Sequence, residues 1–425
     1  MNDAPPSPRS AAPPLERATL RRLMLFFGIV YVVEGLGQTG GLIAQPLTYF
    51  LKEHHGWTAI QVTAFLTLFN LPWVIKPVYG VVSDFVPLFG YRRKSYLLLA
   101  NVLASGAFLW VATTTEPGQL ALALLLTAYA MAISSTLCGG LLVENGQKFG
   151  ASGRLVNQQW LWFNVAGMVA AILGGQLIQR LSPAGALHAA AFILAAAPLA
   201  LIWGTWRLVD EEKSAINLAE LKRTFASLVS AFKNRKLWIV TLFLFLYWFS
   251  PGFGTPLYYH MTDHLKFSQS FIGLLGSISS AGWILGALIY DRYLDGLPSR
   301  TLLNLSIAMG TLTTASFLML GSETSAVILN FISGLSAMLA TVSTLRVAAE
   351  YSPPRSEGFA YAVLTSITNL SASGADNVGS LLYERAFNGN LTPLILVSAL
   401  ATAIAFVLVP MLRLGGAPKA ATGAS

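Results

Sequence analysis

Residues 71–94, LPWVIKPVYGVVSDFVPLFGYRRK, decide the class of this protein. They join the end of one apolar run to the start of the next. Lys76 and Asp84 are eight residues apart, about two helical turns, and Arg92, Arg93 and Lys94 follow. Charges that interrupt a nearly continuous apolar chain need a partner or water. The stretch therefore indicates a charged loop between two membrane spans.

The composition indicates an integral membrane protein. Of the 425 residues, 54% are hydrophobic and only 11% are charged, whereas soluble globular chains are about 25% charged. The net charge of +8 is spread over the loops, which is typical of membrane proteins, so no nucleic-acid partner is expected. The single cysteine, Cys138, excludes an intramolecular disulfide. Without a His/Cys cluster or a phosphate-loop motif, no metal site and no cofactor is predicted.

Apolar runs of the length of a membrane helix, about 20 residues, occur twelve times in the chain. We expect the first run to kink at Gly40, Gly41 or Pro46, and the seventh to break around Pro251 and Gly252. The runs cover residues 20–50, 58–83, 95–115, 118–143, 155–179, 185–206, 237–260, 269–294, 299–320, 324–349, 357–383 and 391–412.

The longest polar interruption, residues 209–235, separates six runs from six. It is expected to be either an amphipathic helix on the membrane surface or a plain linker. The predicted units are a disordered tail (1–19), an N-terminal bundle (20–208), the linker (209–235), a C-terminal bundle (236–413) and a tail (414–425). Most of the 27 Lys and Arg residues fall on the side that holds the N-terminus, which places both termini in the cytoplasm. We expect a monomer in a bacterial inner membrane.

Matching motifs in the two halves suggest an internal repeat. Gly80 and Asp84 lead to Gly90 and Arg92, and Gly286 and Asp291 lead to Gly296 and Arg300. Six plus six spans with matching loops predict an all-α integral membrane protein with the major facilitator fold, in which two six-helix bundles enclose a central cavity.

The run PWVIKPVYGVVSDFVPLFGYRRKSY resembles the signature of the folate–biopterin transporter family. The stretches that begin at Pro251 and Ser352 resemble that family's seventh and eighth spans and its entry into span eleven. The resemblance covers most of residues 30–385 and implies transport of folates, pterins or related metabolites. One departure stands out, because the family is expected to carry acidic residues along span four. Here that stretch reads ISSTLCGGLLVEN, and Glu144 at its inner end is its one acidic residue.

Glu34 and Gln38 lie one turn apart near the middle of span one and share a face. A carboxyl group at this depth is expected to carry protons or to accept hydrogen bonds from a pterin edge. The alternative is a structural carboxyl group bonded to a neighbouring helix. Both residues are candidates for substrate binding, and Glu34 is also a candidate for proton coupling.

Lys76 lies between Pro72 and Pro77, so a kink is expected beside it. One interpretation is that Lys76 attracts an anionic substrate, such as the glutamate tail of a folate. The other is that it pairs with Asp84 or Glu144 as part of a gate. Glu144 is also a candidate for proton coupling.

Asp84, Arg92 and Arg93 are interpreted as a gating cluster, with an Asp84–Arg92 contact that opens and closes during transport. Asp291 and Arg300 are expected to play the same part in the second half. For Arg93 and Lys94 the alternative is that membrane topology alone explains their charge.

Further polar and aromatic residues in spans five, seven, ten and eleven are candidates for lining the cavity. Amides suit heterocycle edges and aromatic rings stack on flat ligands, although interhelix hydrogen bonds, interfacial aromatics or an Arg346–Glu350 pair are the alternatives. The substrate candidates are Gln158, Trp160, Asn164, Trp248, Tyr258, Arg346 and Asn369, and the further proton-coupling candidate is Asp376.

These features together predict a proton-coupled secondary transporter that moves a folate, a pterin or a similar flat anionic metabolite by alternating access. The alternatives are a carrier of the same fold for muropeptide-like or aromatic metabolites, and a membrane sensor that does not transport. An enzyme is not expected, because no nucleophile–base constellation stands out. The expected partners are the small-molecule substrate, protons and the lipid bilayer.

Overall fold

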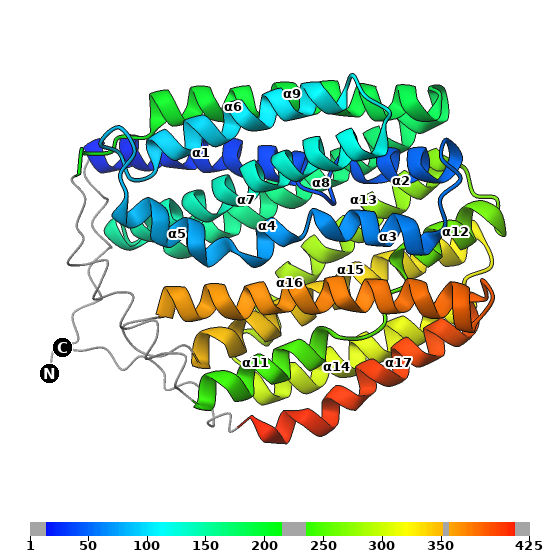
Figure 1. Cartoon of the computed structure of the whole chain (residues 1–425). Helices are drawn as coiled ribbons and strands as arrows, with labels where there is room; N and C mark the ends of the chain where they lie inside the picture. The colour runs from blue at the N-terminus through cyan, green and yellow to red at the C-terminus, as the bar shows by residue number, and fades with distance from the viewer. Residues whose placement is uncertain (1–13, 215–234, 352–356, 413–425) are drawn as a thin grey trace, which may run out of the picture.

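The computed structural model describes residues 14–214, 235–351 and 357–412 as a bundle of roughly aligned helices (Figure 1). The first half of the chain forms one side of the bundle and the second half forms the other. The tail from 414 and most of the predicted linker lie outside the described residues. One predicted boundary is corrected, because residues 14–19 of the expected disordered tail already belong to the first helix.

The first six spans follow the predicted runs, and the connections that follow spans three, four and five are short. Their helices are α1 (Pro14–Gly37), α2 (Ala44–Glu53), α3 (Ala59–Leu68), α4 (Leu71–Val74), α5 (Lys76–Phe85), α6 (Lys94–Val111), α7 (Pro117–Lys148), α8 (Ser152–Arg180) and α9 (Pro183–Leu208).

The last six spans also match the prediction, and two of them end in a turn of π-helix. Their helices are α11 (Arg235–Trp248), α12 (Gly254–Asp263), α13 (Gln269–Ile289) with η1 (Tyr290–Leu294), α14 (Ser299–Ser316) with η2 (Phe317–Met319), α15 (Glu323–Tyr351), α16 (Glu357–Leu381) with η3 (Leu382–Ala386), and α17 (Leu391–Leu408) with η4 (Val409–Met411).

Eight of the described helices are long and apolar enough to cross a membrane unaided. The other four spans are α1 with α2, α3 to α5, α11 with α12, and the polar α16. These are the spans that carry Glu34, Lys76, Trp248 and Asp376. Broken backbone and charged side chains at membrane depth are tolerated where they face protein or a wet cavity. These four spans are therefore the ones expected to face protein or a cavity.

Glycine and proline cause the breaks, as predicted. Between α1 and α2, the Leu42 N–H donates to the Leu36 carbonyl over 2.9 Å. A Cβ atom on Gly41 would lie 2.2 Å from that same carbonyl oxygen, so the turn requires glycine. Pro77 stands in the first turn of α5, just after the break at Ile75.

Two pairs of spans join the halves of the bundle. Helix α8 packs along α13, and α3 to α5 lie beside α16. Small residues allow the first pair to approach closely: a Cβ atom on Gly175 would lie 2.7 Å from the Gln269 carbonyl oxygen. The two halves therefore touch along these helices and leave space for cavities elsewhere between them.

We call the end that holds Arg92, Arg93 and Lys94 the basic end. The polar contacts between the second and eleventh spans lie away from this end and recur about once per helical turn. They are Ile60 N–H to Glu384 Oε1 (2.8 Å), Thr63 Oγ1 with Ser380 Oγ (2.7 Å), Asn377 Nδ2 to Thr67 Oγ1 (2.6 Å) and Asn70 Nδ2 to Ser373 Oγ (3.0 Å). We call this set the polar ladder. Helix α5 continues toward the basic end and forms no hydrogen bond or ion pair with the described residues of α16.

Candidate functional site

Glu34 of α1 and Lys76 of α5 are linked through Ser135 of α7. The Ser135 hydroxyl donates to Glu34 Oε1 over 2.8 Å, and Lys76 Nζ donates to Ser135 Oγ over 3.2 Å. The second carboxylate oxygen of Glu34 is buried and has no hydrogen-bond partner among the described residues. Of the two interpretations of Lys76, pairing with Asp84 or Glu144 is wrong, because Lys76 donates to Ser135 and both acids pair with Arg93. We call these three residues the bridged triad.

Beside the bridged triad lies a cavity of about 250 Å³ between the two halves. Lys76 Nζ sits 4.2 Å from the ring centroid of Trp73, and Trp73 lines this cavity. Gln38, one turn beyond Glu34, lines it from the same half. Asn70, Asn369, Ser373 and Asp376 are among the other lining residues. The first half of the chain thus supplies an aromatic ring and amides, and the second supplies an amide, a hydroxyl group and a carboxylate.

Asp376 borders a second cavity as well, of about 370 Å³, inside the C-terminal half. Trp248 lines that cavity, and its indole Nε1 is buried without a hydrogen-bond partner among the described residues. Asp376 itself is exposed and forms no hydrogen bond or ion pair with any described residue. A Cβ atom on Gly252 would lie 1.9 Å from Asp376 Oδ1, so the break in span seven packs directly on this carboxylate.

A third cavity, of about 320 Å³, lies between spans one, five, seven and eight. It shares Gly40 with the first cavity and Gly254 with the second. Tyr258 lines it and donates its hydroxyl to Gln269 Oε1 over 2.9 Å. The three cavities therefore meet where spans one and seven are broken.

The candidates in span five make structural contacts. Gln158 Nε2 donates to the Met24 carbonyl over 2.8 Å, and Asn164 Nδ2 donates to the Trp160 carbonyl over 2.8 Å. Trp160 packs across the interface on Trp283 of α13, with ring centroids 5.0 Å apart. None of these three candidates is among the lining residues of the cavities described above.

Arg346 takes the alternative role that the sequence left open. Its Nε lies 3.6 Å from Glu350 Oε1, and its Nη1 donates to the Asp295 carbonyl over 3.0 Å. These contacts hold Arg346 at the basic end, away from the residues that line the cavities.

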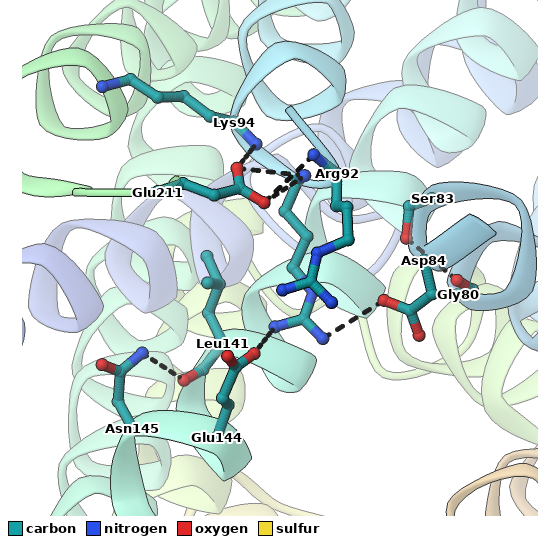
Figure 2. A network of polar contacts seen from close by, with 10 residues as sticks. Gly80, Ser83, Asp84, Arg92, Lys94, Leu141, Glu144, Asn145 and Glu211 are labelled. Carbon is teal, nitrogen blue, oxygen red and sulfur yellow. Dashed lines mark hydrogen bonds and ion pairs between the residues drawn. The ribbon is translucent and has the colours of Figure 1, made fainter. Parts of the chain in front are cut away.

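At the basic end of the N-terminal half, Arg93 joins two acids from different helices, Asp84 and Glu144, which Figure 2 labels. Its Nη2 lies 3.3 Å from Asp84 Oδ1, and its Nη1 lies 2.5 Å from Glu144 Oε2. The expected Asp84–Arg92 contact is therefore corrected, since Arg92 forms no ion pair with the described residues. Glu144, predicted to couple protons, is the second of the two acids that pair with Arg93.

Sequence reasoning missed Glu211, which follows α9. Its carboxylate accepts the backbone N–H groups of Arg92 (3.1 Å), Arg93 (3.1 Å) and Lys94 (2.8 Å), as Figure 2 shows. These groups form the N-terminus of α6, where a negative charge is stabilising. More than a hundred residues separate the partners, so no local pattern pairs them. Ser135 was also missed as a site residue, although the polar run in span four was noticed.

The repeated motif in the C-terminal half does not repeat the contacts. Asp291 and Arg300 are both exposed, and neither forms an ion pair among the described residues. Instead, Ser299 donates a hydrogen bond to Glu350, which also pairs with Arg346. The two halves therefore share a sequence pattern at the basic end, with different partners in each half.

Comparison with known proteins identifies relatives along most of the chain. A family model described as the BT1 family matches residues 36–417. The folate-biopterin transporter of Synechocystis is 28% identical over 91% of this chain and 81% of its own length. The probable folate-biopterin transporter 6 of Arabidopsis thaliana is 25% identical over 66% of this chain and 59% of its own length. This chain therefore spans about three-fifths of the length of that plant relative.

Solved structures show the same fold. The nucleoside transporter NupG superposes with a TM-score of 0.69 at 17% identity, over 93% of this chain and 99% of that protein. A D-xylose–proton symporter superposes with a TM-score of 0.69 at 12% identity, over 93% and 98%. With the twelve spans and the extent of the family match, these comparisons establish that the chain is a membrane transporter of the major facilitator fold and belongs to the BT1 family.

Proposed function

We propose that this transporter moves a folate, a pterin or a similar flat anionic metabolite by alternating access, coupled to protons. The observation that carries the proposal is the bridged triad beside a polar cavity between the two halves. Relatives named folate-biopterin transporter along most of the chain support the choice of substrate. Amides and an aromatic ring in the cavity suit a flat heterocycle.

The distribution of contacts between the halves supports alternating access. The polar ladder joins spans two and eleven away from the basic end, and Lys52 of α2 pairs with Asp263 of α12 over 2.7 Å. Toward the basic end, α5 forms no such bond with the described part of α16. A transporter whose halves are fastened at one end can rock open at the other. We assign the basic end to the cytoplasm because positive loops face that side.

The bridged triad supports proton coupling. When Glu34 is ionised, its negative charge offsets the positive charge of Lys76, to which the Ser135 hydroxyl links it. A proton on Glu34 removes that negative charge and leaves the Lys76 ammonium group available to an anionic substrate. Proton uptake and binding of an anion would then favour each other. Asp376 is the second candidate for a coupling carboxylate, because it is exposed to two cavities.

The test is uptake of labelled folate into proteoliposomes that contain the purified full chain, with and without an inward proton gradient. We expect the gradient to raise both the rate and the level of accumulation. The Glu34→Gln variant is expected to exchange substrate across the membrane without accumulating it. Uptake that ignores the gradient contradicts the coupling. Failure of folate, pterin and adenosyl metabolites alike contradicts the substrate class.

Two outcomes correspond to the alternatives. Uptake of a muropeptide or an aromatic metabolite in place of folate would assign another cargo to the same fold. Binding of folate without uptake under any gradient would identify a membrane sensor. Residence in a bacterial inner membrane and a monomeric state belong to the same proposal, and light scattering of the purified protein tests the second.

A further inference from the structure

The charges around the cavities are distributed unevenly. Among the described residues that line the first and second cavities, Asp376 is the one charged side chain, and it borders both. Glu34 cannot serve a ligand in the same way. It lines neither cavity, one of its oxygens accepts from Ser135, and the other is buried. The carboxylate that an occupant meets is therefore Asp376.

Two amide donors near Asp376 are used by other acceptors. Asn70 Nδ2 donates to Ser373 Oγ over 3.0 Å, and Asn377 Nδ2 donates to Thr67 Oγ1 and to the Ser373 carbonyl. Asp376 receives none of these hydrogen bonds. A carboxylate at membrane depth without a donor is costly unless water or a ligand supplies one. A ligand group with N–H or O–H donors would therefore suit this site.

The position of this carboxylate is fixed by the break in span seven. The Gly252 N–H donates to the Ala375 carbonyl over 2.9 Å, and the Gly252 backbone packs directly on Asp376. A Cβ atom on Gly379 would lie 1.7 Å from the Gly252 carbonyl oxygen, so glycine is needed on both sides of this contact. The backbone that carries this acceptor is thus held in place before a ligand arrives, which lowers the cost of ordering the site.

We propose that Asp376 recognises the aminopyrimidinone edge of a pterin ring, and so determines specificity for the ring rather than for the tail. A pterin presents its ring N3–H and its 2-amino group side by side, and a carboxylate can accept both in a bidentate arrangement. The Trp248 indole N–H offers the one buried, unused donor on the wall of the second cavity, for a ring nitrogen or carbonyl. This inference rests on the proposed function.

The same charge dictates which end of a folate enters this site. Asp376 repels a carboxylate, so the glutamate tail of a folate is expected to point away from Asp376. Lys76 is held on the Trp73 ring at the edge of the first cavity. Among the described residues, Lys76 is the basic group that a tail carboxylate would meet beside this cavity. A pterin without a tail therefore retains the contacts that Asp376 provides.

The experiment measures equilibrium binding of three compounds to the purified full chain in detergent, by displacement of labelled folate. The compounds are pterin, lumazine and p-aminobenzoylglutamate. Lumazine carries a carbonyl group where pterin carries its 2-amino group, so it presents an acceptor to Asp376. The wild-type protein is expected to bind pterin at least tenfold more tightly than lumazine. Asp376→Asn is expected to bring that ratio close to one, because the amide offers both a donor and an acceptor.

Asp210→Asn is the matched control, since this aspartate is 84% exposed at the basic end, and it should keep the wild-type ratio. Equal losses for pterin and lumazine in Asp376→Asn would overturn the proposal, because they would indicate a structural role. A wild-type protein that binds folate without preferring pterin to lumazine would overturn it too. If labelled folate does not bind to the wild-type protein at all, the proposed function itself fails. Binding of pterin and of lumazine is then compared directly by calorimetry. A pterin-to-lumazine affinity ratio that is unchanged in Asp376→Asn still overturns the inference.

Discussion

Lys76 reaches Glu34 only through the hydroxyl of Ser135, which accepts from Lys76 Nζ over 3.2 Å and donates to Glu34 Oε1 over 2.8 Å. A direct ion pair would hold both charges tightly and resist change. A serine between them keeps them coupled through a rotatable group. Each charge can then be released when a proton or a substrate arrives.

Replacing Ser135 with Ala should lower gradient-driven uptake by about tenfold or more. The change removes one hydrogen bond to each of two charged groups, and such bonds contribute about 1.5–3 kcal/mol each. Initial uptake rates in proteoliposomes measure the effect, and Ser135→Thr should restore most of it by returning the hydroxyl. Thr136→Val is the matched control, since the Thr136 hydroxyl donates only to the Ala132 carbonyl of its own helix.

The partners in this triad should also behave as one unit. The effects of Glu34→Gln and Ser135→Ala on uptake are expected to be strongly non-additive, because both changes interrupt the same link. Additive losses in the double variant would show that Ser135 acts independently of Glu34.

Removing the Arg93 side chain should destabilise the basic end. Arg93→Ala breaks ion pairs to Asp84 and Glu144, whose side chains are 43% and 55% exposed, so a loss of about 1 kcal/mol is expected. Thermal unfolding of the detergent-solubilised protein measures it. Arg92→Ala is the control, because the Arg92 side chain pairs with neither acid. A larger loss for Arg92→Ala than for Arg93→Ala would contradict the corrected assignment.

Glu211 should stabilise the N-terminus of α6. Glu211→Ala leaves three backbone N–H groups without their acceptor, and the loss of such a cap costs about 1 kcal/mol. Glu212→Ala provides the matched comparison, since Glu212 is exposed and makes none of these contacts. Equal unfolding temperatures for the two variants would rule out a capping role for Glu211.

A cross-link across the polar ladder should stop transport reversibly. Thr63 Oγ1 and Ser380 Oγ lie 2.7 Å apart on opposite halves, so Thr63→Cys with Ser380→Cys is expected to form a disulfide on oxidation. The native Cys138 is buried, which limits unwanted pairing. Uptake should fall with the fraction cross-linked and return on reduction, because locked halves cannot rock apart.

Each single-cysteine variant serves as the control for oxidation. Full uptake by the cross-linked transporter would contradict alternating access through this interface, since the ladder would then stay closed throughout the cycle.

The local features of the fold could be predicted from the sequence alone. Membrane spans depend on the apolar length of a run, and the breaks at Gly41, Pro77 and Pro251 depend on backbone chemistry at single positions. The same reasoning found Glu34, Lys76 and Asp376, because a charge in an apolar run is conspicuous wherever its partner lies.

The tertiary structure decided which of these groups meet. Arg92 and Arg93 are neighbours in the sequence, and only the packing of α5 against α7 determines that Arg93 is the one that reaches Asp84 and Glu144. The repeated motif at Asp291 and Arg300 does not form an ion pair for the same reason, because the sequence of the motif is repeated and the residues packed around it are not. A sequence can show that a charge needs a partner. Side-chain direction and the separation of helices distant in the chain decide whether that partner is a serine or an acid.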